Sequence, residues 1–358
     1  MPSLSPASST ALRILEQMQA DLPSQDAIYQ PTNFWAQASQ PIIDELRQHG
    51  FDAFRSLETT RVFFVPTYGA PGGAYTREQF EQLMALVGSM DKPGGKTYQS
   101  LLHALSGELW ALADYRVLLA SSADDKGWPL ASFSESDVGA PQEQFRFDGR
   151  AFSRSALNYL NGLSFLRQQI GDEVASIRNV LEIGGGFGTL GEILSQLGRF
   201  SYIDVDIPPT AAVSSFYLKQ QGGEHFTDYL ATRELDVIDV PAAPRQMVLC
   251  PWQLPKVQGT IDLFVNFISF QEMELHVVKN YLQQVDRLQT RYVLLRNLRE
   301  GKAVKSDQVR YGVDKPLLGS DYDTLLPNYE LLATNVYPFG YRTIDGFHSE
   351  LRLYRRRG

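Results

Sequence analysis

The chain lacks most of the features that mark secreted, membrane-bound or disulfide-stabilised proteins. It has a single cysteine, Cys250, in 358 residues, which excludes an internal disulfide and a cysteine-based structural zinc site. No apolar run approaches the roughly 20 residues of a membrane span, and the polar start lacks the basic-then-apolar order of a signal peptide. These absences predict a cytoplasmic protein without a membrane partner.

A surplus of positive charge is missing as well. The 33 lysines and arginines are outnumbered by 41 aspartates and glutamates, which gives a net charge of −8. Such a chain has no general attraction for phosphate backbones, so nucleic acid is not an expected partner. No compact spacing of histidine, aspartate and glutamate demands a metal site. The composition leaves a homo-oligomer possible and does not decide it.

A strand, a glycine-rich turn and a helix are predicted in succession between residues 179 and 197. The apolar run 180–183 ends in Gly184, Gly186 and Gly188, where the backbone N–H groups can approach a ligand closely. Apolar residues then recur at helical spacing, which is the opening of a nucleotide-binding α/β unit. Glu182 is the exception in this strand, because a buried carboxylate is costly unless something binds it.

Strand-like and helical patterns alternate after residue 171, which predicts a doubly wound parallel sheet. The expected strands are 180–183, 200–205, 246–250, 261–267 and 292–295. Two further strand-like runs, 329–336 and 349–354, are joined without room for a long crossover helix, so the last strand is expected to be antiparallel. We therefore expect an α/β nucleotide-binding domain over residues 147–358.

The part of the chain before residue 147 has mainly helical periodicity. Residues 11–146 are expected to form a smaller, mainly helical domain that covers the substrate side of the nucleotide-binding domain, the acceptor site described below. Residues 1–10 are rich in serine, proline and alanine, which bury too little surface to offset chain entropy, and they are expected to be disordered.

The glycine turn is compatible with two kinds of cofactor. Gly186-Phe-Gly-Thr-Leu-Gly191 matches the G-x-G-x-x-G pattern of dinucleotide sites. Glu182 favours S-adenosylmethionine instead, because a carboxylate there can face the positively charged amino-acid end of that cofactor. Asp206 closes the next strand 206 − 188 = 18 residues after Gly188, where an acid can accept hydrogen bonds from both ribose hydroxyls.

These stretches resemble known motifs. Residues 180–188 and 202–208 resemble the first two motifs of class I S-adenosylmethionine-dependent methyltransferases. More narrowly, residues 63–69, the glycine loop and residues 266–273 are similar to the sugar O-methyltransferase family of bacterial natural-product clusters. The resemblance implies a Rossmann-like methyltransferase sheet and S-adenosylmethionine as cofactor.

The resemblance also implies roles for single residues. Glu182 and the glycines Gly184, Gly186 and Gly188 would line the methionine and ribose portion of the cofactor, and Asp206 would hold the ribose hydroxyls. Gln253 would flank the adenine, and Asn266 would join the cofactor contacts. The commoner methyltransferase pattern has an acid near the position of Gln253, whose amide oxygen would have to accept the hydrogen bond of the adenine amino group.

Candidates for the chemistry follow the fourth strand of the predicted sheet. Glu272 and His276 are four residues apart and share one face if the helix has begun by Glu272. They could act as general base and orienting group, although glutamates at this point are also favoured by the helix dipole alone. Tyr68 is a candidate for the acceptor pocket, and Trp128 and Phe133 are either a further wall of that pocket or core.

The function expected from these residues is transfer of a methyl group to a hydroxyl of a sugar or glycosylated small molecule, in natural-product biosynthesis. N-methylation of an amine-bearing small molecule is the alternative within this class. An NAD(P)-dependent oxidoreductase, and a binding protein that keeps the fold without turnover, are the alternatives from other classes.

Overall fold

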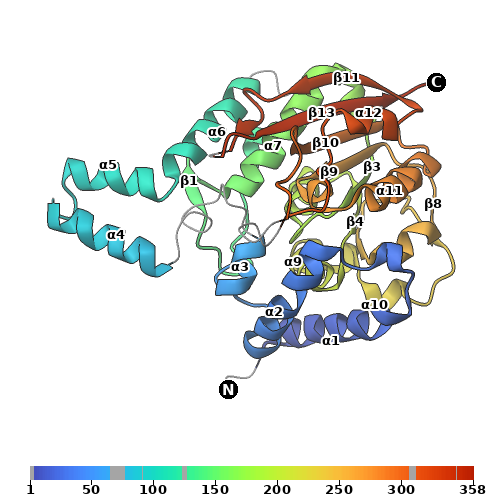
Figure 1. Cartoon of the computed structure of the whole chain (residues 1–358), viewed down its shortest axis with the longest axis horizontal. Coiled ribbons are helices and arrows are strands. Elements are labelled where there is room, and N and C mark those ends of the chain that lie inside the picture. The colour runs from blue at the N-terminus through green and yellow to red at the C-terminus, as the bar shows by residue number, and fades with distance from the viewer. Residues whose placement is uncertain (1–3, 65–76, 91, 123–126, 306–311, 344) are drawn as a thin grey trace.

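A nine-stranded mixed sheet lies at the centre of the computed structural model, which describes all residues except 1–3, 65–76, 91, 123–126, 306–311 and 344 (Figure 1). Its order is β11-β13-β10-β9-β3-β4-β7-β5, with β12 paired to β13. The strands are β3 (Asn179–Ile183), β4 (Ser201–Val205), β5 (Phe226–Thr227), β7 (Gln246–Leu249), β9 (Leu263–Phe267), β10 (Tyr292–Leu298), β11 (Tyr329–Asn335), β12 (Tyr341–Arg342) and β13 (His348–Arg356).

The pairing confirms the predicted doubly wound, Rossmann-like sheet with an antiparallel last strand. Strands β5, β7, β4, β3, β9 and β10 run parallel to one another. Strand β13 is antiparallel to β10, β11 and β12. From β3 the chain passes through β4 to the edge strand β5, comes back to form β7 between them, and then crosses to the other side of β3 to form β9. The strand order therefore reverses beside β3, and in such sheets ligands bind at the carboxyl ends of the strands next to this point.

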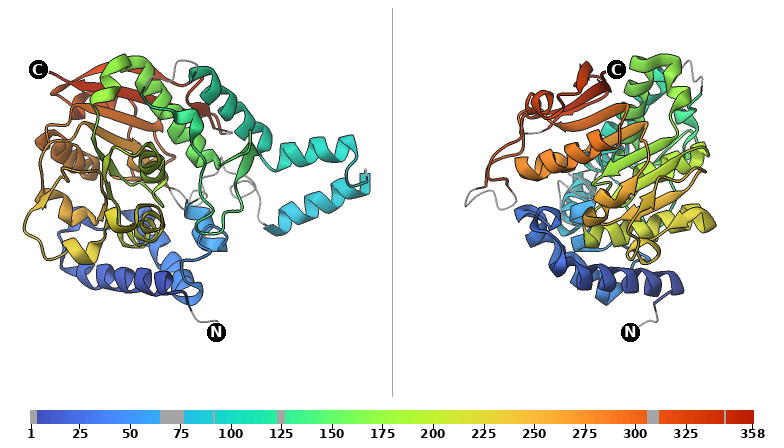
Figure 2. Two further views of the ribbon diagram at one scale, coloured as in Figure 1. Left: turned by 180° about the vertical axis from the view of Figure 1, so that it is seen from behind. Right: turned by 90° about the vertical axis from the view of Figure 1, so that its right-hand side faces the viewer.

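The helices form a layer on each face of the sheet (Figure 2). The main helices are α1 (Pro6–Asp21), α2 (Asn33–His49), α3 (Glu58–Phe64), α4 (Arg77–Met90), α5 (Lys96–Leu105), α6 (Glu108–Ser121), α7 (Arg154–Ile170), α8 (Thr189–Leu197), α9 (Pro208–Gly222), α10 (Tyr229–Thr232), α11 (Leu275–Arg287) and α12 (Asp321–Leu325). Helices α7, α8 and α9 pack side by side on one face, and α11 lies on the other. Right-handed crossovers that run in opposite directions from β3 require this split.

The N-terminal segment is ordered earlier than the sequence predicts. Helix α1 begins at Pro6, where the side chain of Ser5 accepts a hydrogen bond from the backbone N–H of Ser8. The expectation of disorder is therefore wrong for residues 6–10, because the helix packs its apolar side against α9 and α10 of the sheet domain.

Residues on both sides of the predicted boundary at 147 contribute to one continuous hydrophobic core, which runs from Ala11 to Tyr354. The boundary itself falls in a small hairpin of β1 (Phe145–Phe147) and β2 (Arg150–Phe152). Two short strands, β6 (Ile238–Asp239) and β8 (Val257–Gln258), pair apart from the main sheet. The division into domains stays a prediction.

Helices α2 and α3 lie near the carboxyl ends of the strands, whereas α4 and α5 form an arm that projects from the body (Figure 1).

Candidate functional site

The glycine loop between β3 and α8 forms the centre of the candidate site. The N–H of Gly184 donates to the carbonyl of Val205 at 2.9 Å, which holds the start of the loop against β4. Gly186 has a φ of +64°, and among the described residues a Cβ added there would meet nothing within 4 Å. On Gly184 the same Cβ would lie 2.1 Å from Ser269 Oγ. The loop is thus packed against protein at Gly184 and faces open space at Gly186.

Asp206 borders this open space at the end of β4, where the sequence placed it. Its Oδ2 accepts a hydrogen bond from the N–H of Gly186 at 3.2 Å, and its Oδ1 accepts one from the N–H of Ile207 at 2.8 Å. The residue is 9% exposed. Burial, with a contribution from the charge of Asp204, raises the pKa of Asp206 well above its usual range. Each oxygen keeps a lone pair for a ligand hydroxyl.

Glu182 lies beneath the loop rather than on its open side. It is fully buried, and its two oxygens accept hydrogen bonds from the hydroxyls of Tyr159 at 2.7 Å and Tyr202 at 2.5 Å. Burial, followed by the charge of Asp204, raises the pKa of Glu182 to about 8. The two tyrosines explain how the strand can bury this carboxylate. Glu182 does not contact a ligand on the open side of the loop and can act on it only by electrostatics across the loop.

Asp204 is the partner of Glu182 on the neighbouring strand. The two residues are in register across β3 and β4, and Asp204 also accepts a hydrogen bond from Ser214 Oγ. Burial raises the pKa of Asp204 to about 7. A Cβ on Gly185 would lie 2.6 Å from Asp204 Oδ1 and 2.9 Å from Glu182 Oε2. The loop therefore rests directly on two buried acids, and a cation above it would favour their ionised forms.

Gln253 is placed differently from the expectation. Its Oε1 accepts a hydrogen bond from the N–H of Cys250 at 2.8 Å, and its Nε2 donates to Thr232 Oγ1 at 3.0 Å. The side chain is fully buried. The amide oxygen that was expected at the adenine thus holds the turn after β7, and Trp252 packs edge-on against Tyr229 next to it.

Asn266 ties the ends of two strands together. Its Nδ2 donates to the carbonyl of Ile183 at 2.8 Å and to Ser269 Oγ at 2.5 Å, and its Oδ1 accepts from the N–H of Phe270 at 3.2 Å and from Asn297 Nδ2 at 3.1 Å. Its polar atoms are engaged within the protein, so its contribution to the site is to fix the end of β3 below the glycine loop.

The predicted pairing of Glu272 with His276 does not form. Helix α11 begins at Leu275, and Glu272 belongs to the separate 3₁₀ turn Ser269–Glu272, so the premise of one shared helix face is wrong. Glu272 Oε1 instead accepts a hydrogen bond from Lys302 Nζ at 2.7 Å in a largely buried ion pair. His276 is exposed on the first turn of α11.

Aromatic residues that sequence reasoning did not assign to the site adjoin this ion pair. The ammonium of Lys302 lies 4.1 Å from the centroid of the Phe34 ring. Phe34 contacts Trp35 and Phe63 in an aromatic cluster that is only half-buried. Pattern alone could not find Lys302, because it follows β10 in a stretch without periodicity. The Asn33-Phe-Trp segment carried a signal only for a helix start.

Of the three further candidates, only Trp128 and Phe133 lie among the described residues, and neither takes part in this site. Tyr68 lies outside the described residues. Trp128 is fully buried against Phe200, at the amino end of β4, and is therefore on the opposite edge of the sheet from the glycine loop. Phe133 is buried against Phe152. Both of these aromatic residues belong to the core and not to an acceptor pocket.

The described part of the chain contains no group of three or more histidine, cysteine, aspartate or glutamate side chains that could hold a metal ion. In the same residues, no helix has both the length and the apolar character that crossing a membrane requires.

Comparisons with known proteins give fold-level similarity only. No family model and no curated protein sequence matches the chain. Among solved structures it is similar to magnesium protoporphyrin IX methyltransferase from Synechocystis PCC 6803 with bound SAM, at 16% identity and a TM-score of 0.37, over 56% of this chain and 81% of that one. TehB from Haemophilus influenzae matches at 13% identity and 0.36, over 53% and 62%.

A S-adenosylmethionine-dependent methyltransferase from Clostridium acetobutylicum ATCC 824 matches at 12% identity and a TM-score of 0.37, over 57% of this chain and 94% of that one. Each TM-score is below 0.5, so these likenesses carry no conclusion about activity or ligand. The function has to be argued from the site.

Proposed function

We propose that this chain is an S-adenosylmethionine-dependent methyltransferase that acts on a hydroxyl of a sugar or glycosylated small molecule. The observation that carries the proposal is the cradle at the end of β3 and β4. Open space over Gly186 is bordered by the carboxylate of Asp206, and two buried acids, Glu182 and Asp204, lie under the same loop. A ligand with vicinal hydroxyls and a cationic group fits this arrangement.

A dinucleotide fits the same cradle less well. Its pyrophosphate would bring two negative charges over a loop that rests on Glu182 and Asp204, and these charges would oppose the ionisation of both acids. Sulfonium and ammonium groups have the opposite effect, because they stabilise the ionised acids beneath them. A cationic ligand therefore gains by ionising the acids below the loop, whereas a pyrophosphate gains nothing from them, and this difference is the reason to prefer S-adenosylmethionine over NAD(P).

The acceptor side of the proposed site is built from the segments after β9 and β10. When bound, S-adenosylmethionine supplies an electrophilic methyl group. Glu272 accepts the proton of the acceptor hydroxyl, and Lys302 holds that carboxylate in place through the 2.7 Å hydrogen bond. A positioned base of this kind contributes ~10²–10⁴-fold to a rate.

The half-buried rings of Phe34, Trp35 and Phe63 form the apolar border of this acceptor side. Such rings pack against the C–H faces of sugars and of aromatic aglycones, and they exclude water from the proton transfer. Their combination with a carboxylate and an ammonium group is the reason to favour a carbohydrate hydroxyl over an amine, since methylation of an amine needs no strong base.

Titration calorimetry with S-adenosylhomocysteine and, in parallel, with NADH tests the proposal. We expect binding of S-adenosylhomocysteine and none of NADH; the reverse result would overturn the choice of cofactor. Incubation with S-adenosylmethionine and a panel of glycosides and amino sugars, followed by mass spectrometry, then identifies the methylated atom. Tight cofactor binding without transfer to any acceptor would favour a binding protein that keeps the fold.

A further inference from the structure

Helix α6 is largely apolar on the side that faces solvent, where Arg116 is the one charged residue, as well as on the side that faces the core. Ala111, Tyr115 and Leu118 are buried against the body. The exposed positions are Leu109, Trp110, Ala113, Arg116, Leu119 and Ala120. Trp110 is 66% exposed and Leu109 is 50% exposed. A surface helix normally has a polar outer side, and one that is apolar all round is normally buried. We therefore expect another protein surface or a ligand to cover the outer side of α6.

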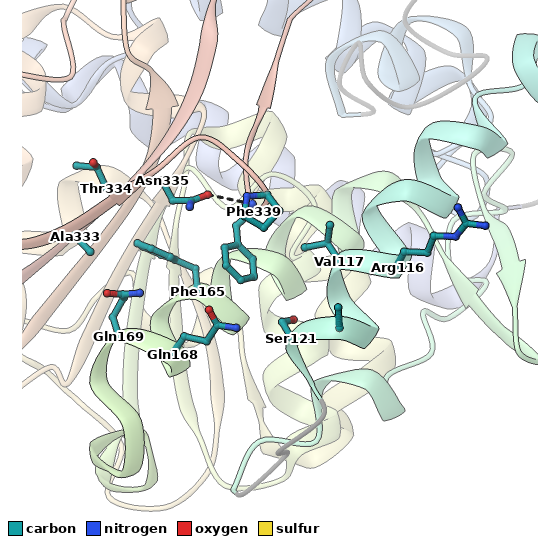
Figure 3. A pocket seen from close by; sticks show the side chains of 12 residues that line it. Arg116, Val117, Ser121, Phe165, Gln168, Gln169, Ala333, Thr334, Asn335 and Phe339 are labelled. Atoms are coloured by element: carbon teal, nitrogen blue, oxygen red, sulfur yellow. Dashed lines mark hydrogen bonds between the residues drawn. The ribbon is translucent and has the colours of Figure 1, made fainter.

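A groove continues the outer side of α6. It has a volume of about 580 Å³ and lies between α6, α7 and the edge strand β11 (Figure 3). The rings of Phe165 and Phe339 form its floor, and Val117 and Ala120 of α6 form one wall. The guanidinium of Arg116 points away from the two rings (Figure 3). The groove is thus a depression with aromatic rings at its centre, lined also by polar residues of α7 and β11, at the end of α6 that is remote from Trp110.

The arm of α4 and α5 lies at the other end of α6. It stands away from the body in two views of the molecule (Figures 1 and 2). None of the residues of α5 is buried, and Leu86 and Met90 of α4 are 59% and 70% exposed. Isolated helices of 14 and 10 residues are marginal in water without packing against other elements. The arm therefore also needs a surface to pack against.

We propose that a second copy of this chain covers the outer side of α6, with a two-fold axis across the helix near Ala113. Trp110 and Val117 lie two helical turns apart on one side of α6, about 10 Å along the axis. In an antiparallel pair of α6 helices, Trp110 of each copy reaches the groove end of the other. The large side chain and the depression are then complementary, and the same patch serves on both copies, as a two-fold interface requires.

The outer side of α6 is too small to form a stable interface by itself, but the unpacked surface extends beyond it. A stable interface buries ~800 Å² per partner. Helix α6 has 14 residues, so its outer side measures roughly 21 Å by 10 Å, or about 200 Å². The groove and the arm, at opposite ends of α6, have to supply the remaining buried area. The two-fold axis places the arm of one copy next to the groove of the other copy. A small ligand in the groove would leave Trp110 and the arm exposed.

Sedimentation velocity of the full chain over a wide concentration range tests the interface. We expect twice the monomer mass of 40.2 kDa. Trp110→Glu and Leu109→Glu each place a charge in the contact and should raise the dimer dissociation constant by about 30-fold or more. The matched control is Leu235→Glu, since Leu235 is 44% exposed away from α6, and it should leave the mass unchanged. Circular dichroism checks that each variant is folded.

A cysteine at the proposed axis tests the geometry independently of stability. The native cysteine, Cys250, is buried, so Ala113→Cys adds an accessible thiol on α6. Mild oxidation with diamide should cross-link Ala113→Cys to a covalent dimer, and Leu235→Cys should stay monomeric on the same gel. A monomeric wild-type chain at all concentrations would overturn the proposal and leave the face to a different partner. A dimer that survives both glutamate variants without cross-linking would overturn it equally.

Discussion

The carboxylates of Glu182 and Asp204 face one another across two parallel strands, and neither is exposed to solvent. Burial raises the pKa of Glu182 to about 8 and that of Asp204 to about 7. Two hydroxyl donors, Tyr159 and Tyr202, satisfy Glu182 without fully offsetting the cost of burial. The pair therefore holds protons at neutral pH that an unfolded chain would release.

This retained proton predicts a pH-dependent stability. Between pH 4.5 and about 8 the folded state keeps a proton on Glu182 that the unfolded state has lost. The free energy of unfolding then falls as the pH rises through this window, by about 1.4 kcal/mol per pH unit for one retained proton. Glu182→Gln removes this contribution, so its stability relative to wild type should rise with pH up to about 8 and level off above it.

Urea unfolding of both proteins at a series of pH values measures the difference. The exposed Glu224→Gln exchange is the control, because it removes one carboxylate from the surface, and its curve should follow that of the wild type. Parallel curves for wild type and Glu182→Gln would show that the buried carboxyl is not protonated in the folded state.

Cofactor binding should release protons near neutral pH. A cationic ligand above Gly185 stabilises the ionised forms of Glu182 and Asp204, and each of these acids then loses part of its proton. Calorimetric titration of S-adenosylmethionine at pH 7, in buffers with different ionisation enthalpies, measures the number of protons released. We expect a net release by the wild type and a smaller one by Glu182→Gln. Equal release by the two proteins would mean that the loop does not transmit the charge.

The open space over Gly186 gives a paired test with a glycine that is remote from the site. Gly186 and Gly198 have φ values of +64° and +74°, and a Cβ on either meets nothing within 4 Å. Alanine at either position costs about 1 kcal/mol of backbone strain. Only Gly186→Ala places a methyl group in the proposed cradle. We expect it to weaken S-adenosylhomocysteine binding at least tenfold in calorimetry, while Gly198→Ala keeps wild-type affinity at a similar loss of thermal stability.

Sequence patterns predicted those parts of the fold that depend on local chemistry. The parallel strands are short apolar runs, and the loop at 184–188 needs glycine for its backbone conformation, so both were visible in the chain. The antiparallel last strand followed from the short connection before β13. Asp206 was found because an acid at the end of the second strand of such a unit has a fixed place.

Contacts between distant segments could not be predicted in this way. The tyrosines that hold Glu182 come from α7 and β4, and nothing in the strand itself indicates them. Helix α11 starts later than the pattern suggested, because Ile268 adopts a φ of +75° and the next four residues form a 3₁₀ turn. The meeting of Lys302 with Glu272 and Phe34 is likewise a consequence of packing between remote parts of the chain.

The ion pair of Glu272 and Lys302 distinguishes the two acceptor chemistries. If Glu272 accepts the proton of a hydroxyl, Glu272→Gln should lower kcat by ~10²–10⁴-fold and leave the affinity for S-adenosylhomocysteine unchanged, since the glutamine keeps the shape of the site. Lys302→Met removes the hydrogen bond that holds the carboxylate of Glu272 in place, so it should lower kcat and leave the KM for the acceptor unchanged.

His276→Gln gives the matched comparison, because His276 is the other candidate after the fourth strand and lies exposed on α11. A loss in this variant comparable with that of Glu272→Gln would restore the histidine to the proton transfer. If both Glu272→Gln and Lys302→Met turn over at the wild-type rate, the acceptor needs no base, and an amine becomes the favoured acceptor. Comparing kcat with KM in the Lys302 variant separates a misplaced base, which lowers kcat alone, from weaker acceptor binding, which raises KM.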